Sequence, residues 1–179
     1  MFAEKTGRIK QISTGGVLQA MRRYAFMFML AVIFTVPAAG QKVTEIGREE
    51  LLSLTDRSGD TTYVINFWAT WCSPCVKEIG YFEDLHNEQA SSGVRVILVS
   101  LDFPNQIESR VIPFLEEKNI TAPVMLMTDL RYNEWIDRVD PGWSGAIPAT
   151  LIYNNDHRVF LEKELTREEL YEQVNLIRN

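Results

Sequence analysis

The chain has 179 residues, of which 46% are hydrophobic and 11% aromatic, so its composition excludes an intrinsically disordered protein and fits one globular domain. Residues 1–40 hold five of the 18 basic and one of the 24 acidic side chains, so the formal net charge of −6 becomes −10 for residues 41–179. Such an acidic surface repels nucleic acids and anionic membranes, and we therefore expect no nucleic-acid partner.

The first forty residues differ in composition from the rest. Met21 is followed by two arginines, an apolar stretch at 24–36, and then small residues up to position 40, which is the pattern of a secretory signal peptide. The apolar stretch is shorter than the roughly twenty residues needed to cross a bilayer, so cleavage is favoured over a membrane anchor, which remains the alternative. We predict a signal peptide at 21–40, an unstructured extension or mis-called start at 1–20, and a periplasmic or otherwise extracytoplasmic domain at 41–179.

The periodicity of residues 41–179 predicts alternating helices and strands. In chain order these are a helix at 49–54, a strand at 62–69, a helix at 74–89, a strand at 94–101, a helix at 106–118 interrupted at Pro113, a strand at 123–127, a helix at 132–139, strands at 149–153 and 157–161, and a helix at 167–177. The alternation requires parallel strands, whereas the last two strands are close enough to form a hairpin. We therefore expect an α/β fold with a central mixed β-sheet flanked by helices.

The sequence Trp71-Cys72-Ser73-Pro74-Cys75 holds the only two cysteines of the chain and follows the predicted strand at 62–69. Two residues between the cysteines let one helical turn bring both sulfurs within bridging distance. Pro74 suits the first turn of a helix, where its missing N–H costs nothing. Cys72 would then lie at a helix N-terminus, where unpaired amides favour a thiolate, so Cys72 is the predicted nucleophile.

Three segments give the chain a family resemblance: residues 66–75 (Asn-Phe-Trp-Ala-Thr-Trp-Cys-Ser-Pro-Cys), Lys77-Glu78, and residues 145–150 (Gly-Ala-Ile-Pro-Ala-Thr). On these the chain resembles thioredoxin-fold proteins, and more narrowly the TlpA/ResA-type secreted thiol-disulfide oxidoreductases, over residues 43–179. The resemblance implies a thioredoxin-like fold and a cofactor-free, monomeric disulfide reductase. Its partners would be disulfide-containing client proteins, with apocytochrome c among the candidates, and an upstream thiol reductant such as a membrane electron carrier.

The resemblance also implies a wall for the client beside the catalytic pair Cys72 and Cys75. Pro148 is expected to follow a cis peptide bond, which is affordable only before proline, and to lie against the sulfurs. Ile147 is expected to offer its backbone to a bound peptide. Trp71 is expected to shield the pair.

Asn66 stands where cytoplasmic thioredoxins carry a buried aspartate, and an amide cannot titrate. In the family that this chain resembles, a glutamate after the C-x-x-C motif is associated with the surroundings of that buried position. Glu78 matches this glutamate and lies one helical turn after Cys75. Partial burial would raise the pKa of Glu78 towards a value at which it can accept a proton from Cys75. The alternative is a solvated helix carboxylate with no role in the reaction. Gly80 replaces the proline usual two residues later, which leaves a helix bend there in doubt. Trp143 either covers the site or packs on the core.

Other functions stay open at this point. The dipeptide Ser73-Pro74 does not set the direction of electron flow, so a disulfide oxidase or isomerase is the main enzymatic alternative. A peroxiredoxin-like peroxidase has a related fold, but its single peroxidatic cysteine sits in a different local motif. Zinc needs four ligands, and His86 and His157 lack ligand spacing, so no metal site is predicted. A copper or haem-apoprotein chaperone using the same cysteines is the non-enzymatic alternative.

Overall fold

The computed structural model describes residues 42–178. The predicted signal peptide at 21–40 and the predicted extension at 1–20 lie outside the described residues. No helix within residues 42–178 has the length and apolar character that a membrane span requires.

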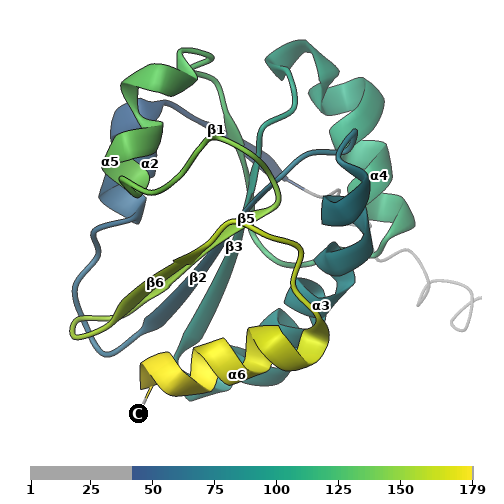
Figure 1. The fold of residues 1–179 in the computed structure, drawn as a ribbon. Helices are drawn as coiled ribbons and strands as arrows, with labels where there is room; N and C mark the ends of the chain where they lie inside the picture. The colour runs from purple at the N-terminus through teal and green to yellow at the C-terminus, as the bar shows by residue number, and fades with distance from the viewer. Residues whose placement is uncertain (1–41, 179) are drawn as a thin grey trace, which may run out of the picture. The chain divides into compact units, whose positions relative to one another are not determined.

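A six-stranded mixed sheet forms the centre of the domain, with the strand order β1-β4-β3-β2-β5-β6 (Figure 1). The strands are β1 (Val43–Ile46), β2 (Thr62–Trp68), β3 (Val94–Ser100), β4 (Val124–Met127), β5 (Ala149–Tyr153) and β6 (Arg158–Leu161). Strands β1 to β4 run parallel to one another, whereas β5 is antiparallel to β2 and β6 is antiparallel to β5. The predicted mixed sheet and the C-terminal hairpin are both confirmed.

Helices cover both faces of this sheet. They are α2 (Arg48–Leu54), α3 (Ser73–Gln89), α4 (Ile112–Glu117), α5 (Ile136–Val139) and α6 (Arg167–Arg178). In Figure 1, α3, α4 and α6 lie on one face, and α2 and α5 lie on the other. The central strand β2 serves both layers, because its pleat sends Val64 and Trp68 into the core under α3, and Ile65 and Phe67 into the core on the opposite face.

Two segments differ from the prediction. Strand β1 was not predicted, because it is a four-residue edge strand in which Thr44 and Glu45 are exposed, and only its pairing with β4 makes it a strand. The predicted helix at 106–118 is divided into a 3-10 turn (Pro104–Gln106), a π-helical turn (Ile107–Val111) and α4. The interruption was expected at Pro113, whose missing N–H removes one helical hydrogen bond.

Two further expectations concern the helix predicted at 132–139 and a bend in the helix that contains Gly80. The predicted helix at 132–139 is a 3-10 turn (Tyr132–Glu134) followed by α5. Helix α3 continues through Gly80 as one element, so the absence of a proline there leaves the helix unbroken. The C-x-x-C motif thus lies where it was predicted, between the carboxyl end of the central strand β2 and the start of the long helix α3.

Candidate active site

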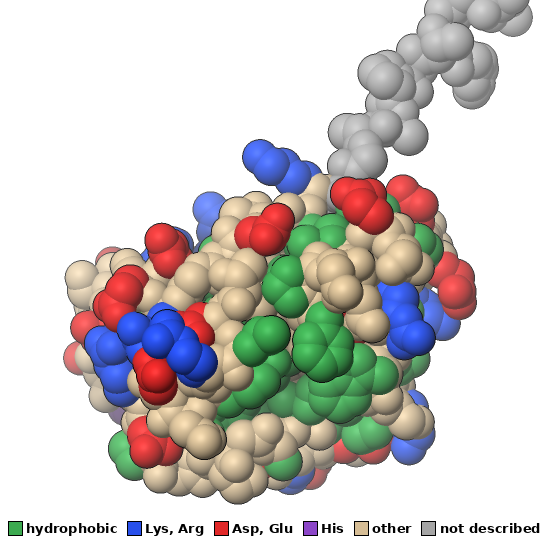
Figure 2. Space-filling model, turned by 90° about the horizontal axis from the view of Figure 1, so that it is seen from above, with side chains coloured by type: hydrophobic (Ala, Val, Ile, Leu, Met, Phe, Trp, Pro, Cys, Tyr) green, Lys and Arg blue, Asp and Glu red, His purple; other side chains and the backbone are tan. Residues whose placement is uncertain are grey.

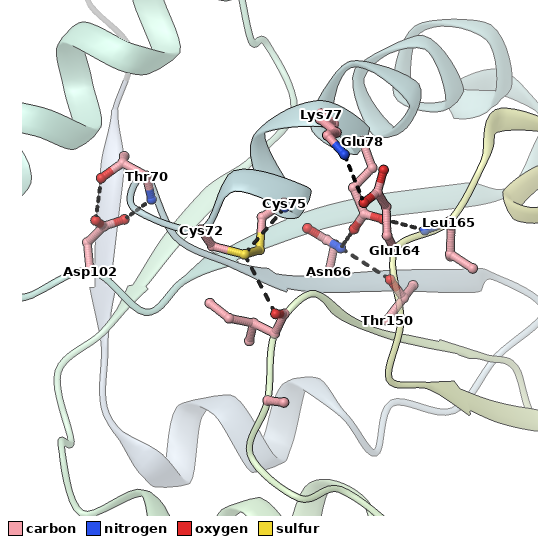
Figure 3. The surroundings of a disulfide bond; sticks show 12 residues. Asn66, Thr70, Cys72, Cys75, Lys77, Glu78, Asp102, Thr150, Glu164 and Leu165 are labelled. Carbon is pink, nitrogen blue, oxygen red and sulfur yellow. Dashed lines mark hydrogen bonds and ion pairs between the residues drawn. A yellow bond between two sulfur atoms is a disulfide. The ribbon is translucent and has the colours of Figure 1, made fainter.

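A disulfide joins Cys72 and Cys75, whose Cα atoms lie 5.3 Å apart (Figure 3). Cys72 is the N-cap of α3, and its Sγ accepts a hydrogen bond of 3.4 Å from the backbone N–H of Cys75. Pro74 lies in the first turn of the helix, as expected. Cys75 is completely buried, whereas Cys72 is 6% exposed, so Cys72 is the sulfur that another molecule can reach.

The turn that carries Cys72 is held by a carboxylate from the neighbouring strand. Asp102, just beyond the end of β3, is fully buried and accepts hydrogen bonds from the Thr70 N–H at 3.0 Å and from the Thr70 Oγ1 at 2.6 Å. A third donor to this carboxylate is the Ser100 hydroxyl, at 2.8 Å. Sequence reasoning missed Asp102, although a carboxylate directly after an apolar strand is a signal that could have found it.

The peptide bond between Ile147 and Pro148 is cis, as expected. Pro148 is buried and Ile147 is half-buried. The carbonyl oxygen of Ile147 lies 3.6 Å from the Cys72 Sγ (Figure 3). The loop before β5 therefore forms a wall directly against the more accessible sulfur.

A second carboxylate that sequence reasoning missed shapes this wall. Glu162, the residue after β6, accepts hydrogen bonds from the N–H groups of Ser144 at 3.1 Å and Ala146 at 3.0 Å, and from the Ser144 hydroxyl. Gly145 between them has a φ of 92°, a conformation that favours glycine. Although desolvation acts to raise it, hydrogen bonds from Ser144 and Ala146 hold the pKa of Glu162 below its usual range.

Trp143 is part of the core. It is 3% exposed and its ring packs against Phe67, Trp135 and Phe160. Its Nε1 donates to the carbonyl oxygen of Ala146 at 2.9 Å, so it also steadies the loop before Pro148. Of the two alternatives for Trp143, packing on the core is the correct one.

Glu78 is fully buried, so the alternative of a solvated helix carboxylate is wrong. Its Oε1 accepts a hydrogen bond of 3.0 Å from the Asn66 Nδ2, and its Oε2 accepts one of 2.6 Å from the Leu165 N–H. Burial raises the pKa of Glu78 to about 7, against the lowering effect of these two hydrogen bonds, and the nearby Glu164 carboxylate raises it further. The buried carboxylate is one helical turn from Cys75 and can exchange a proton near neutral pH.

Trp71 is 57% exposed beside the disulfide, and Phe103 is 53% exposed just after Asp102. Figure 2 looks onto the carboxyl-terminal end of the parallel strands and shows hydrophobic side chains gathered there. The exposed ring of Trp71 lies open to solvent, which suits contact with another molecule better than shielding of the sulfurs.

Other sites in residues 42–178 offer little chemistry. No three His, Cys, Asp or Glu side chains within this range are grouped so that they could hold a metal ion. A cavity of about 270 Å³ is lined by residues 55–58 and 153–158, at the amino-terminal end of β2 and away from the disulfide.

Comparison with known proteins shows which family the chain belongs to. The AhpC/TSA family model matches residues 31–160. The chain belongs to the AhpC/TSA family. It is similar to the thiol-disulfide oxidoreductase ResA of Oceanobacillus iheyensis, with 36% identity over 84 residues, which are 47% of this chain and 42% of the relative. The ResA protein of Bacillus subtilis is 28% identical over 129 residues, which are 71% of this chain and 66% of the relative.

The chain therefore spans less than two thirds of the length of each of these two relatives. Among solved structures, a thiol:disulfide interchange protein of the thioredoxin family from Chlorobium tepidum has a TM-score of 0.56 and 22% identity, over 67% of this chain and 81% of that one. The predicted thioredoxin-like fold and the resemblance to ResA-type proteins are both confirmed.

Proposed function

We propose that this member of the AhpC/TSA family is an extracytoplasmic thiol-disulfide oxidoreductase that reduces disulfides in client proteins. The observation that carries the proposal is the Cys72–Cys75 disulfide at the start of α3, in which one sulfur is accessible and the other is buried. A pair of this kind can cycle between dithiol and disulfide without moving the backbone. The names of the ResA relatives support the same class of reaction.

Cys72 is the proposed nucleophile. Its position as the N-cap places its sulfur at the positive end of the helix dipole, and the Cys75 N–H donates to it at 3.4 Å. Both effects stabilise a thiolate over a thiol. The Cys72 thiolate attacks one sulfur of a client disulfide, forming a mixed disulfide, and the other client sulfur leaves as a thiolate that takes up a proton.

Cys75 resolves the mixed disulfide. Its thiol proton passes to the Glu78 carboxylate, and the Cys75 thiolate attacks the Cys72 sulfur. The bond between Cys72 and the client breaks, and the client leaves with two thiols. The protein has then given up two electrons as the Cys72–Cys75 disulfide, and an upstream thiol reductant, such as a membrane electron carrier, must restore the dithiol.

The client is proposed to bind as an extended segment along Ile147 and Pro148. The Ile147 N–H has no hydrogen-bond partner within residues 42–178, and its carbonyl oxygen lies beside the Cys72 sulfur. A client backbone can therefore pair with Ile147 while its disulfide meets Cys72. The exposed ring of Trp71 supplies apolar contact next to the same sulfur.

The proposed location follows from the signal-peptide pattern at 21–40. A protein exported in this way would meet secreted proteins as its clients, and the cysteines of apocytochrome c are one candidate substrate; we propose that it acts as a monomer. N-terminal sequencing of the exported protein tests the cleavage. A mature N-terminus near residue 41 supports the proposal, and an N-terminus upstream of Met21 contradicts it.

The reaction is tested by reduction of insulin with the purified protein and dithiothreitol, together with covalent trapping of clients. Cys75→Ser should hold clients as mixed disulfides on Cys72, whereas the matched variant Cys72→Ser should hold none. Trapping by Cys72→Ser alone would reverse the two roles, and equal trapping by both variants would contradict the assignment of Cys72 as the nucleophile. A stoichiometric bound metal without insulin turnover would replace the oxidoreductase by a metal chaperone.

A further inference from the structure

One buried side-chain oxygen in the strand that leads to the disulfide has no hydrogen-bond donor among residues 42–178. The side chain of Asn66 in β2 is fully buried, and its Oδ1 accepts no hydrogen bond from residues 42–178. A buried carbonyl oxygen without a donor costs stability, because it has lost its hydrogen bonds to water. The other end of the same amide is saturated, since Nδ2 donates to the Glu78 carboxylate at 3.0 Å and to the Thr150 Oγ1 at 3.1 Å.

These two hydrogen bonds give the direction of the amide. Its NH₂ end faces Glu78 and Thr150, so its oxygen lies at the opposite end. The pleat of β2 places Asn66 between Val64 and Trp68, whose side chains lie in the core that also contains Cys75. In Figure 3 the Asn66 oxygen points away from Glu78 and towards the two sulfurs.

We propose that the Asn66 Oδ1 is the acceptor for the thiol hydrogen of Cys75 in the reduced protein. In the disulfide neither sulfur carries a hydrogen, which leaves this oxygen without a donor. Reduction gives Cys75 an S–H group, the only kind of donor that this buried site gains. Asn66 is thus a positioning residue that holds the resolving thiol, and the inference rests on the redox cycle proposed above.

The inference links the amide to the redox equilibrium. The oxidised state contains an unpaired oxygen, and the reduced state pairs it, so Asn66 favours the dithiol relative to an apolar residue of the same size. It also keeps the Cys75 thiol beside the Glu78 side chain, because one amide contacts both. The hydrogen bond involves no transfer of a proton or electron to Asn66.

Infrared spectroscopy of a single thiol tests this directly. The Cys72→Ala variant retains Cys75 as its only thiol, since the chain has only two cysteines. A hydrogen-bonded S–H group stretches at lower frequency than a free one. We expect the lower frequency in Cys72→Ala, a shift to the free frequency in Cys72→Ala/Asn66→Leu, and no shift in the matched control Cys72→Ala/Thr150→Val, which retains the Asn66 oxygen.

A free S–H frequency in Cys72→Ala itself would overturn the inference, even if the Asn66→Leu protein does not fold. Redox equilibration with glutathione gives a second readout in the two-cysteine protein. Asn66→Leu should shift the equilibrium about tenfold towards the disulfide, or roughly 30 mV to a more negative potential. A shift towards the dithiol would contradict the inference. Neither measurement requires client turnover, so a failure of wild-type insulin reduction would remove the proposed function separately.

Discussion

Thr70 and Asp102 are joined by two hydrogen bonds, one from the Thr70 backbone N–H at 3.0 Å and one from its hydroxyl at 2.6 Å. The two residues lie just past the ends of adjacent parallel strands, β2 and β3. Their contact continues the pairing of the strands into the turn that carries Cys72. A buried carboxylate thus fixes the backbone from which the accessible sulfur projects.

The variant Thr70→Val removes the hydroxyl of this contact at nearly constant volume and retains the backbone N–H. We expect a loss of about 1–3 kcal/mol in the free energy of unfolding, because one buried acceptor of Asp102 loses its donor. Urea denaturation of the oxidised protein measures this. The same measurement is made for Thr70→Val in an Asp102→Asn background. If Thr70→Val lowers the free energy of unfolding equally in both backgrounds, the two residues are not coupled and the contact is contradicted.

Glu78 makes the stability of the oxidised protein depend on pH. Its pKa is about 7 in the folded protein and near 4.5 in the unfolded chain. Between these values the folded protein binds more protons, so stability is fully present below about pH 4.5 and declines as the pH rises to about 7. The decline attributable to this carboxyl group is roughly 3 kcal/mol.

Urea unfolding of the oxidised protein at a series of pH values measures this decline. Glu78→Gln should show a flatter dependence between pH 4.5 and 7, because the amide does not titrate. It should also slow resolution of the mixed disulfide by about 100-fold, since the proton acceptor for Cys75 is lost. Identical pH curves for the wild type and Glu78→Gln would contradict the raised pKa.

Glu162 holds the loop against which a client would bind. The Ser144 N–H donates to Oε2 of Glu162 and the Ala146 N–H donates to Oε1, so in Glu162→Gln, where one oxygen becomes an NH₂ group, one of these two N–H groups loses its acceptor. We expect the KM for insulin to rise roughly tenfold while reduction of a small aromatic disulfide stays unchanged, because the small substrate does not need the loop.

A matched control for this variant is Glu168→Gln. Glu168 is exposed on α6, and its side chain makes no hydrogen bond or ion pair within residues 42–178. Both kinetic constants should stay at their wild-type values in the control. An equal loss with both substrates in Glu162→Gln would show that Glu162 serves general stability and not the client-binding loop.

The two tryptophans near the site should respond in opposite ways. Trp143→Ala removes a ring buried among Phe67, Trp135 and Phe160 and should cost about 3–5 kcal/mol of unfolding free energy. Trp71→Ala removes an exposed ring and should change stability by less than about 0.5 kcal/mol while raising the KM for insulin. Thermal unfolding and insulin kinetics separate the two effects, and an unchanged KM in Trp71→Ala would remove Trp71 from the client surface.

Local patterns were sufficient for much of this fold. The alternation of apolar strands and helices led to the mixed sheet, and the C-x-x-C spacing with Pro74 led to a cysteine pair at a helix start. Strand β1 was not predicted, because two of its four residues are polar and exposed and only its pairing with β4 makes it a strand. The π-helical turn before Pro113 was not predicted, because the proline indicates that the helix is interrupted but does not specify which type of helical turn precedes it.

The candidate site divides in the same way. By itself the sequence determined the cysteine pair at a helix start, because the C-x-x-C spacing and Pro74 act within one turn of the chain. The cis bond before Pro148 and the position of Glu78 were expected from the family resemblance of the sequence, which the structure bears out. Only the tertiary structure decided that Glu78 is buried against Leu165, that Asp102 holds Thr70, and that Glu162 holds Ser144. These partners are 87, 32 and 18 residues apart, and hydrogen bonds over such separations arise from the packing of the whole sheet. The same packing buried the Asn66 oxygen and left it without a donor among residues 42–178.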